Sequence, residues 1–190
     1  MVGHLSRWFV VQDVGPSQLV AGAYQPWLVA LSLVVAIAAS SAALQLAGEA
    51  RRAAPGFYRS AALGTGVVAL GTGVWAMHFI GMVAFQLCAE VRYDPGITLL
   101  SGLPSLAACA VALHLLARPR ITPAQLVLGG VLVGTGIGAM HYGGMLAMDM
   151  APRLAFDPWW FAASIGVAVG LAILALWIRF GLEQGSRLSN

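Results

Sequence analysis

Charge is scarce in this sequence, and lysine is absent altogether. Only 9% of the 190 residues are charged, whereas an ordinary soluble domain carries about 25%. Hydrophobic residues make up 59% of the chain, and the mean hydropathy is +0.84. This composition excludes an ordinary soluble domain and indicates a membrane protein. The net charge of +3 needs no nucleic-acid partner, because arginines in the loops that flank the membrane account for it.

The usual signatures of catalysis and nucleotide binding are also missing. There are two cysteines and neither a CxxC nor an HExxH pattern, so no zinc motif makes a zinc site the favoured one. The Gly-Thr-Gly at 71–73 lacks the following Lys and Ser/Thr of a phosphate loop. No acid–base pair or nucleophile elbow is present, and we therefore expect that the protein is not an enzyme.

Five uncharged runs are each long enough to cross a bilayer, which takes about 20 helical residues. They cover residues 14–48, 60–89, 95–117, 121–148 and 158–178. A run of this length in lipid must be helical, since only a helix pairs all of its own backbone groups. We therefore predict an all-α polytopic transmembrane bundle with helices near 27–47, 61–87, 96–117, 124–148 and 159–179. Prolines stand at or just before four of these starts, where a missing N–H costs nothing: Pro26, Pro95, Pro123 and Pro158.

The arginines predict the orientation of the bundle. Seven lie in two inter-helix linkers and the tail, on one side of the membrane: Arg51, Arg52, Arg59, Arg118, Arg120, Arg179 and Arg187. The other side has three: Arg7, Arg92 and Arg153. The positive-inside rule then places the N-terminus outside and the C-terminus in the cytoplasm. We expect an extracytoplasmic arm over 1–22, a transmembrane domain over 23–180 and a cytoplasmic tail over 181–190.

The chain contains an internal repeat. Residues 71–82 match residues 134–145 without a gap, and the same offset aligns Tyr93-Asp94-Pro95 with Phe156-Asp157-Pro158 and Ser101 with Ser164. A half copy precedes them at Tyr24-Gln25-Pro26 and Ser32. The predicted architecture is a half unit followed by two units of two helices each, running in parallel.

Each full unit has a Met-His motif near the outward end of its first helix. His78 and Met82 are four residues apart and so share a helix face, as do His141 and Met145. Met77 and Met140 flank the histidines. Imidazole with thioether sulfur suits a soft ion, copper(I) above all, although copper(II) and zinc also bind imidazole. Repetition of the motif favours a functional site over the alternative that methionine merely fills an apolar helix.

Other polar residues have weaker claims to a metal. Cys88 lies at the same outer level and is a possible accessory ligand, and His4 stands in the arm. His114, near the cytoplasmic end, has no histidine counterpart in the repeat, so packing or an interfacial position is favoured there. Cys109 receives no role. Asp94 and Asp157 precede helix-starting prolines and are expected to cap helices rather than to bind metal.

The paired segments 75–82 and 138–145, each followed by a Tyr/Phe-Asp-Pro helix start, resemble the bacterial MHYT sensor domain over residues 20–180. The resemblance implies a bacterial inner-membrane sensory module that binds copper through Met, His and aromatic residues near the outer face. It further implies perception of oxygen, carbon monoxide, nitric oxide or a similar small ligand. The candidate metal residues are His78, Met82, His141, Met145, Met77, Met140 and Tyr142.

The sequence departs from the family motif in two ways. The fourth position is Ile80 in one copy and Gly143 in the other, where the family has threonine. The first copy has Phe79 in the tyrosine position, so only Tyr142 offers a phenol. Many relatives fuse this domain to cyclic-dinucleotide enzymes or a histidine kinase. We expect no output domain in this sequence, and therefore a separate signalling partner protein.

Two further functions use the same residues. A copper carrier would take up the ion at the outer Met/His cluster. A transport path through the membrane would need further Met, His or Cys residues at deeper levels, where the sequence offers only Cys109 and His114. A haem protein would ligate iron through His78 and His141. Sensing is the leading hypothesis, with copper transport and a haem redox protein as alternatives.

Overall fold

The computed structural model describes residues 22–87, 91–149 and 156–188, with side chains up to residue 180 in the last range. It contains five helical spans that are long and apolar enough to cross a membrane. They are α1 (Pro26–Arg52), α2 (Phe57–Ala84), α3 (Pro95–Leu100) continued by α4 (Gly102–Leu116), α5 (Pro123–Leu146) and α6 (Pro158–Leu188). The predicted all-α fold is confirmed, and the chain is a multi-pass membrane protein. His4, Cys88 and nearly all of the predicted arm lie outside the described residues.

Local signals set the helix starts. Each of the four prolines named above is the first residue of its helix, and the predicted capping role of the two aspartates is present. The Asp94 carboxylate accepts a hydrogen bond from the Ile97 N–H at 2.8 Å, and that of Asp157 accepts from the Trp159 N–H at 2.8 Å. These bonds satisfy backbone donors that a helix leaves without an internal partner.

The third span is broken, which the sequence analysis did not predict. It was expected as one helix over 96–117, whereas α3 ends at Leu100 and α4 begins at Gly102. Pro104 explains the break, because it has no N–H to bond to the Leu100 carbonyl and its ring crowds that group. The Ser101 hydroxyl lies at the break and donates to the Thr98 carbonyl at 2.7 Å.

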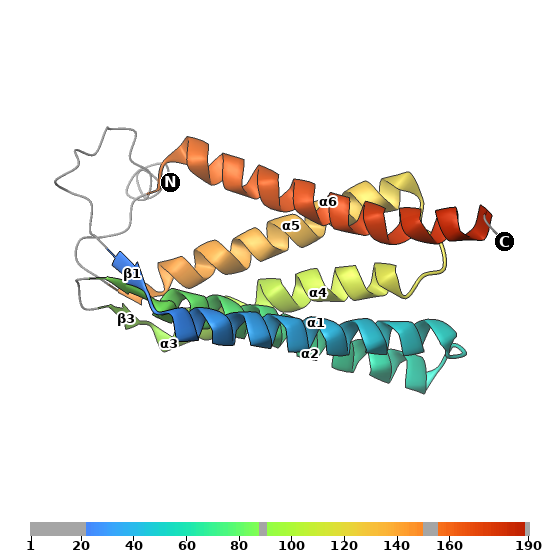
Figure 1. Cartoon of the computed structure of the whole chain (residues 1–190), viewed down its shortest axis with the longest axis horizontal. Coiled ribbons are helices and arrows are strands. Elements are labelled where there is room, and N and C mark those ends of the chain that lie inside the picture. Colours follow the sequence, from blue (N-terminus) through green and yellow to red (C-terminus); the bar gives the residue numbers. More distant parts are fainter. Residues whose placement is uncertain (1–21, 88–90, 150–155, 189–190) are drawn as a thin grey trace.

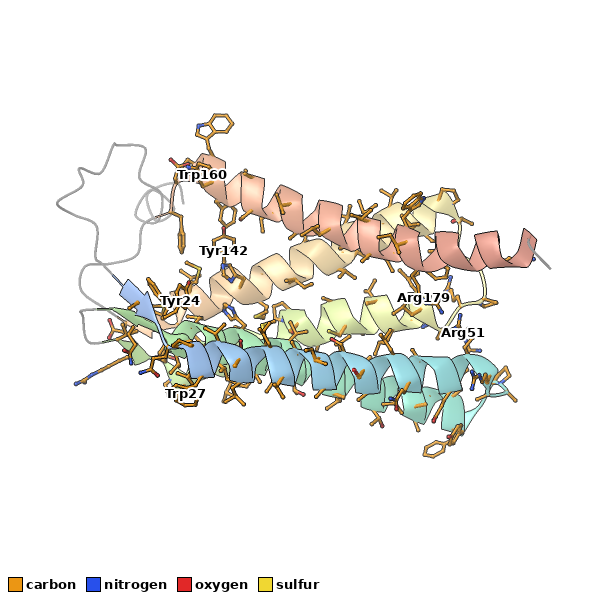
Figure 2. The ribbon with its side chains drawn as sticks, in the orientation of Figure 1. Tyr24, Trp27, Arg51, Tyr142, Trp160 and Arg179 are labelled. Atoms are coloured by element: carbon orange, nitrogen blue, oxygen red, sulfur yellow. The ribbon has the colours of Figure 1, made fainter. Side chains whose placement is uncertain are left out.

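The helices form an open series in which each packs on the next. α1 packs on α2, α2 on α4, α4 on α5, and α5 on α6. Figure 1 shows α1 and α2 together on one side of the molecule and α6 on the other, with α4 between them. Helices α2 and α5 run toward the end that carries the strands, which we call the strand end, and α1, α4 and α6 run away from it. Arg51 and Arg179 lie at the opposite end (Figure 2), which we call the arginine end.

Two short strand pairs close the strand end, and the sequence analysis missed both. β1 (Gly22–Tyr24) pairs with β2 (Phe85–Leu87), and β3 (Arg92–Tyr93) pairs with β4 (Met148–Asp149). Both pairs are antiparallel, and Tyr24 opposite Phe85 corresponds in the repeat to Tyr93 opposite Met148. Each pair fixes the start of one helix beside the end of another.

The repeat extends to backbone hydrogen bonds at the strand end. The Gln25 N–H donates to the Ala84 carbonyl at 2.8 Å, and the Asp94 N–H donates to the Ala147 carbonyl at 2.8 Å. In the repeat, Gln25 is equivalent to Asp94 and Ala84 is equivalent to Ala147, so the two bonds join equivalent residues. The start of α1 is therefore bonded to the end of α2 in the same way as the start of α3 is bonded to the end of α5.

Glycines set the helix contacts, also in repeated form. A Cβ at Gly71 would lie 3.0 Å from Leu106 Cα, and one at Gly134 would lie 2.5 Å from Val169 Cα. These positions are equivalent in the two full units. Close backbone approach at glycine is a common way for membrane helices to associate, because lipid offers no hydrophobic driving force between helices. Close approach at these two glycines thus shapes both the contact of α2 with α4 and that of α5 with α6.

We expect Gly134→Ala to destabilise the fold by about 1–3 kcal/mol, because the new methyl group would overlap the α6 backbone. Thermal unfolding in detergent micelles measures the effect. Gly64→Ala is the matched control, since no described atom outside its own helix turn lies within 4 Å of a Cβ there. The control should be neutral or stabilising, as alanine is the better helix former. Equal stability of both variants would show that the α5–α6 contact does not depend on close approach.

Candidate metal site

Two histidines meet near the strand end. His78 lies on α2 and His141 on α5, each within two turns of the end of its helix. Their ring centroids are 4.9 Å apart, with the ring planes inclined at 61°. The sequence could not show whether the two histidine faces point at each other, and the structure places them in direct contact.

The His78 ring is held in the interior with one nitrogen lacking a partner. Its Nε2 atom is buried, and no hydrogen-bond partner for it exists among the described residues. Such buried polar atoms are rare and call for an explanation, of which an ion is one. A Cβ at Gly144 would lie 2.7 Å from this nitrogen. Glycine at 144 therefore makes room for the imidazole against α5.

His141 is the more open of the pair. Its side chain is exposed in the single chain, whereas that of His78 is partly buried. The repeat explains the difference, because α5 covers His78 through Gly144, while no described helix covers His141 in the equivalent manner. Helix α5 thus closes the site around His78, whereas the site is accessible at His141.

The methionines divide into two pairs by helix register. Met82 and Met145 each lie one turn beyond a histidine on the same helix face. Met77 and Met140 precede the histidines and so point about 100° away around the helix. Met140 is only 2% exposed, which fits a packing residue of the interior. The register favours Met82 and Met145 as the sulfur groups nearest the histidine pair.

Aromatic rings surround the histidines in a repeated pattern. Phe79 packs edge-on against Tyr93 with centroids 6.2 Å apart, and Tyr142 packs edge-on against Phe156 with centroids 5.3 Å apart. These pairs are equivalent in the repeat. Tyr93 lies in β3, outside the spans, and burial raises the pKa of its phenol. The phenol therefore stays neutral, and the Tyr93 ring packs against Phe79 as an apolar surface.

The Tyr142 phenol reaches α6 rather than the histidines. Its oxygen lies 2.6 Å from the Ser164 hydroxyl, and Figure 2 shows its ring between α5 and α6. The Ser164 hydroxyl donates to the Phe161 carbonyl at 2.8 Å, so its oxygen is left to accept from the Tyr142 O–H. Ser101 is the equivalent residue, and it accepts from Trp75 Nε1–H at 3.2 Å. Both serines thus form hydrogen bonds between helices.

The remaining sequence candidates lie elsewhere. His114 is exposed toward the arginine end, where its Nε2 lies 3.1 Å from Arg118 Nη2. Cys109 is buried in α4. Within the described ranges, no three His, Cys, Asp or Glu side chains gather closely enough to hold an ion. A metal at the histidine pair would therefore need sulfur or a small ligand to complete its coordination.

Sequence comparison places the chain among bacterial signalling proteins. The profile of the MHYT family, described as "Bacterial signalling protein N terminal repeat", matches residues 17–58, 71–129 and 134–189. These three matches correspond to the half unit and the two full units of the repeat. No solved structure matches the chain.

Three curated relatives are signalling proteins. The bifunctional diguanylate cyclase/cyclic di-GMP phosphodiesterase MucR of Pseudomonas aeruginosa is 44% identical over 89% of this chain and 24% of its own length. The cyclic di-GMP phosphodiesterase NbdA of the same organism is 37% identical over 80% of this chain and 19% of its own. The signaling protein YkoW of Bacillus subtilis is 30% identical over 84% of this chain and 20% of its own. The chain thus spans about a quarter or less of these relatives.

Proposed function

The chain belongs to the MHYT family of bacterial signalling proteins, and we propose that it is a copper-binding sensory module that perceives a small ligand such as oxygen, carbon monoxide or nitric oxide. The observation that carries the proposal is the contact between His78 and His141. The buried Nε2 of His78 has no hydrogen-bond partner among the residues that the structure describes. Membership of a signalling family supports the sensory role, and the donor set supports the metal.

The spacing of the two rings fits a shared ion. Metal–imidazole bonds are about 2.0–2.1 Å, as in zinc sites, so two rings on one ion have centroids no more than roughly 6.5 Å apart. The observed 4.9 Å is within this limit. His78 and His141 would hold the ion, with Met82 and Met145 as soft thioether ligands and Met77, Met140 and Tyr142 close by. Imidazole and thioether together favour copper over harder ions.

A copper ion at this place would supply an open coordination position for a small uncharged ligand. The protein residues determine access to it. The side of His78 is closed by α5 at Gly144, whereas His141 is exposed, so a ligand would approach from the side of His141. Rings of Phe79 and Tyr142 beside the histidines keep the surroundings apolar, which suits a diatomic gas dissolved in the membrane.

The arginine distribution supports an orientation for this module. The arginine end would face the cytoplasm, and the histidine pair would lie near the outer surface of a bacterial inner membrane, with the N-terminus outside. Two of the relatives named above carry cyclic di-GMP activities in their names, and the chain corresponds to only a fraction of each. Its signal would pass to an enzymatic or regulatory unit on the cytoplasmic side.

Neither alternative fits the site as well. Two histidines on opposite faces of a haem would have ring centroids roughly 6 Å apart with the porphyrin between them, given bonds of about 2 Å. The observed rings are in direct contact at 4.9 Å, which leaves no room for a macrocycle. A transport path would need ligands below the site, and of the two deeper candidates Cys109 is buried while His114 is exposed beside Arg118.

Elemental analysis together with an absorption spectrum tests the proposal. We expect about one equivalent of copper per chain after reconstitution in detergent with copper(I), no Soret band, and a spectral change when carbon monoxide is added. Carbon monoxide is a suitable probe because it binds copper(I) without oxidising it. Absence of copper, or a strong Soret band, would contradict the proposal.

A further inference from the structure

Two buried polar side-chain atoms have no hydrogen-bond partner among the residues that the structure describes. One is the Nε2 atom of His78, and the other is the hydroxyl oxygen of Thr98 on α3. Buried hydroxyls are normally bonded, because a hydrogen bond that is not made costs free energy. The proposed metal site gives the histidine nitrogen a purpose and leaves the threonine hydroxyl unexplained.

Contacts with α2 place Thr98 beside the first histidine motif. The Trp75 Nε1–H donates to the Thr98 carbonyl at 3.0 Å. Trp75 lies three residues before His78, about one turn away on the same side of α2, and its ring packs on Phe79 with centroids 5.1 Å apart. The Phe79 ring in turn packs edge-on against His78. Thr98 is therefore bonded to the segment of α2 that carries the histidine.

Contacts with α5 enclose Thr98 at the same level. The start of α3 is bonded to the end of α5, as described above. About one turn after Thr98, the Ser101 Cβ atom would lie 3.3 Å from a Cβ at Gly143. The next residue of α5 is Gly144, against which the His78 ring lies. Both unpartnered atoms thus belong to residues of one junction between α2, α3 and α5.

The backbone of α3 does not need a hydroxyl at this position. In each of α1, α3 and α6, a serine hydroxyl at the equivalent place donates to the carbonyl three residues earlier. The carbonyls belong to Val29, Thr98 and Phe161, and the distances are 2.7, 2.7 and 2.8 Å. Two of these three residues have apolar side chains with the same backbone bond. The repeat therefore does not account for threonine at 98.

The side chain at this position faces the motif in the second unit. Phe161 is the equivalent of Thr98, and its ring packs on Tyr142 with centroids 4.4 Å apart. Tyr142 is in turn the equivalent of Phe79. The first unit therefore has a short side chain with a hydroxyl where the second has an aromatic ring. Its descending span is also the one that packs on both histidine-bearing helices, α2 and α5.

The helix itself does not satisfy the Thr98 hydroxyl either. The hydroxyls of Thr72 and Thr135 donate to the carbonyls of Val68 and Val131, four residues earlier, at 2.6 and 2.7 Å. Such a bond is a common way for threonine to satisfy its hydroxyl inside a helix. The Thr98 hydroxyl has no acceptor among the described residues. It is a hydrogen-bond donor held beside the candidate metal site.

We propose that the Thr98 hydroxyl is the hydrogen-bond donor for the small ligand at the histidine pair, and that it makes the site favour oxygen over carbon monoxide. Oxygen that draws electron density from a reduced metal accepts a hydrogen bond strongly, whereas carbon monoxide accepts one weakly. Hydrogen-bond donors around an open metal position help to decide which diatomic ligand is bound. This inference rests on the proposed function, because it needs a ligand at the histidine pair.

Thermal unfolding of the metal-free chain in detergent tests whether the hydroxyl serves the fold. Thr98→Val keeps the shape of the side chain and removes the hydroxyl. We expect it to melt about 2–4 °C above wild type, because a buried hydroxyl without a partner lowers stability. Thr135→Val removes a hydroxyl that is bonded within its helix, and this control should not melt higher. An unchanged or lower melting temperature for Thr98→Val would overturn the proposal.

Infrared spectroscopy of the copper(I)-loaded chain under carbon monoxide tests the donor at the ligand. A donor near the ligand lowers the C–O stretching frequency, so Thr98→Val should raise it. Thr98→Ser should keep the wild-type frequency, as should Thr135→Val. The oxygen pressure that removes half of the band should be at least about tenfold higher for Thr98→Val than for wild type.

The outcomes separate this inference from the proposed function. Equal frequencies and equal oxygen pressures in wild type and Thr98→Val would overturn the role of Thr98 and leave the copper site intact. Absence of a carbon monoxide band in the wild type would overturn both.

Discussion

Replacing either His78 or His141 by alanine is expected to remove essentially all bound copper, not half of it. The ring of His78 on α2 contacts that of His141 on α5, so one ion would be bound by both imidazoles. Loss of groups that merely orient a metal ligand typically lowers affinity about 10–100-fold. Loss of a ligand itself should therefore lower the copper(I) affinity by at least about a hundredfold.

Competition against a chromophoric copper(I) chelator in detergent measures this affinity for wild type and for each single variant. His114→Ala is the control, since that histidine is exposed near the arginine end beside Arg118, and it should bind copper as wild type does. If wild type bound two ions and each single variant kept one, the histidines would belong to separate sites and the shared site would be wrong.

The spans were predictable because their signals are local. Each run has its own length and composition, and four of the five helices begin with a proline. Asp94 and Asp157 cap the helices that follow them. The repeat was equally visible, because residues 71–82 and 134–145 align without a gap and are identical at eight of twelve positions. Such features do not depend on which helices become neighbours.

The contact between the histidines depends on neighbours and was not predictable. Helical spacing places His78 and Met82 on one face of α2, but it does not reveal which helix that face meets. The decisive residue is Gly144 on α5, whose missing side chain admits the His78 ring. Gly144 received no role in the sequence analysis, and nothing in the sequence connects it with the histidine of the other unit.

The strand pairs and the break at Ser101 were missed for a different reason. β3 and β4 have two residues each, too few for an alternating pattern of apolar and polar residues to indicate a strand. Their pairing follows from the helices, which bring Tyr93 opposite Met148. Pro104 was a visible signal for the break, since a proline inside an apolar run interrupts the helix before it.

Gly144→Ala should lower the copper affinity at least tenfold while leaving the fold intact. The added methyl group would lie 2.7 Å from His78 Nε2 and 3.2 Å from Phe79 Cζ, so the imidazole must move from its position beside His141. Alanine is the better helix former by up to about 1 kcal/mol, which offsets part of the strain. The same chelator competition, together with thermal unfolding, separates an effect on the site from an effect on the fold.

The repeat offers an internal control for this substitution. Gly81 is the equivalent of Gly144 in the first unit, and no described atom outside its own helix turn lies within 4 Å of a Cβ there. Gly81→Ala should therefore keep the wild-type copper affinity, although it makes the same chemical change in the same motif. If both variants bound copper equally well, the buried His78 nitrogen would not be a ligand. Its lack of a hydrogen bond would then need another cause.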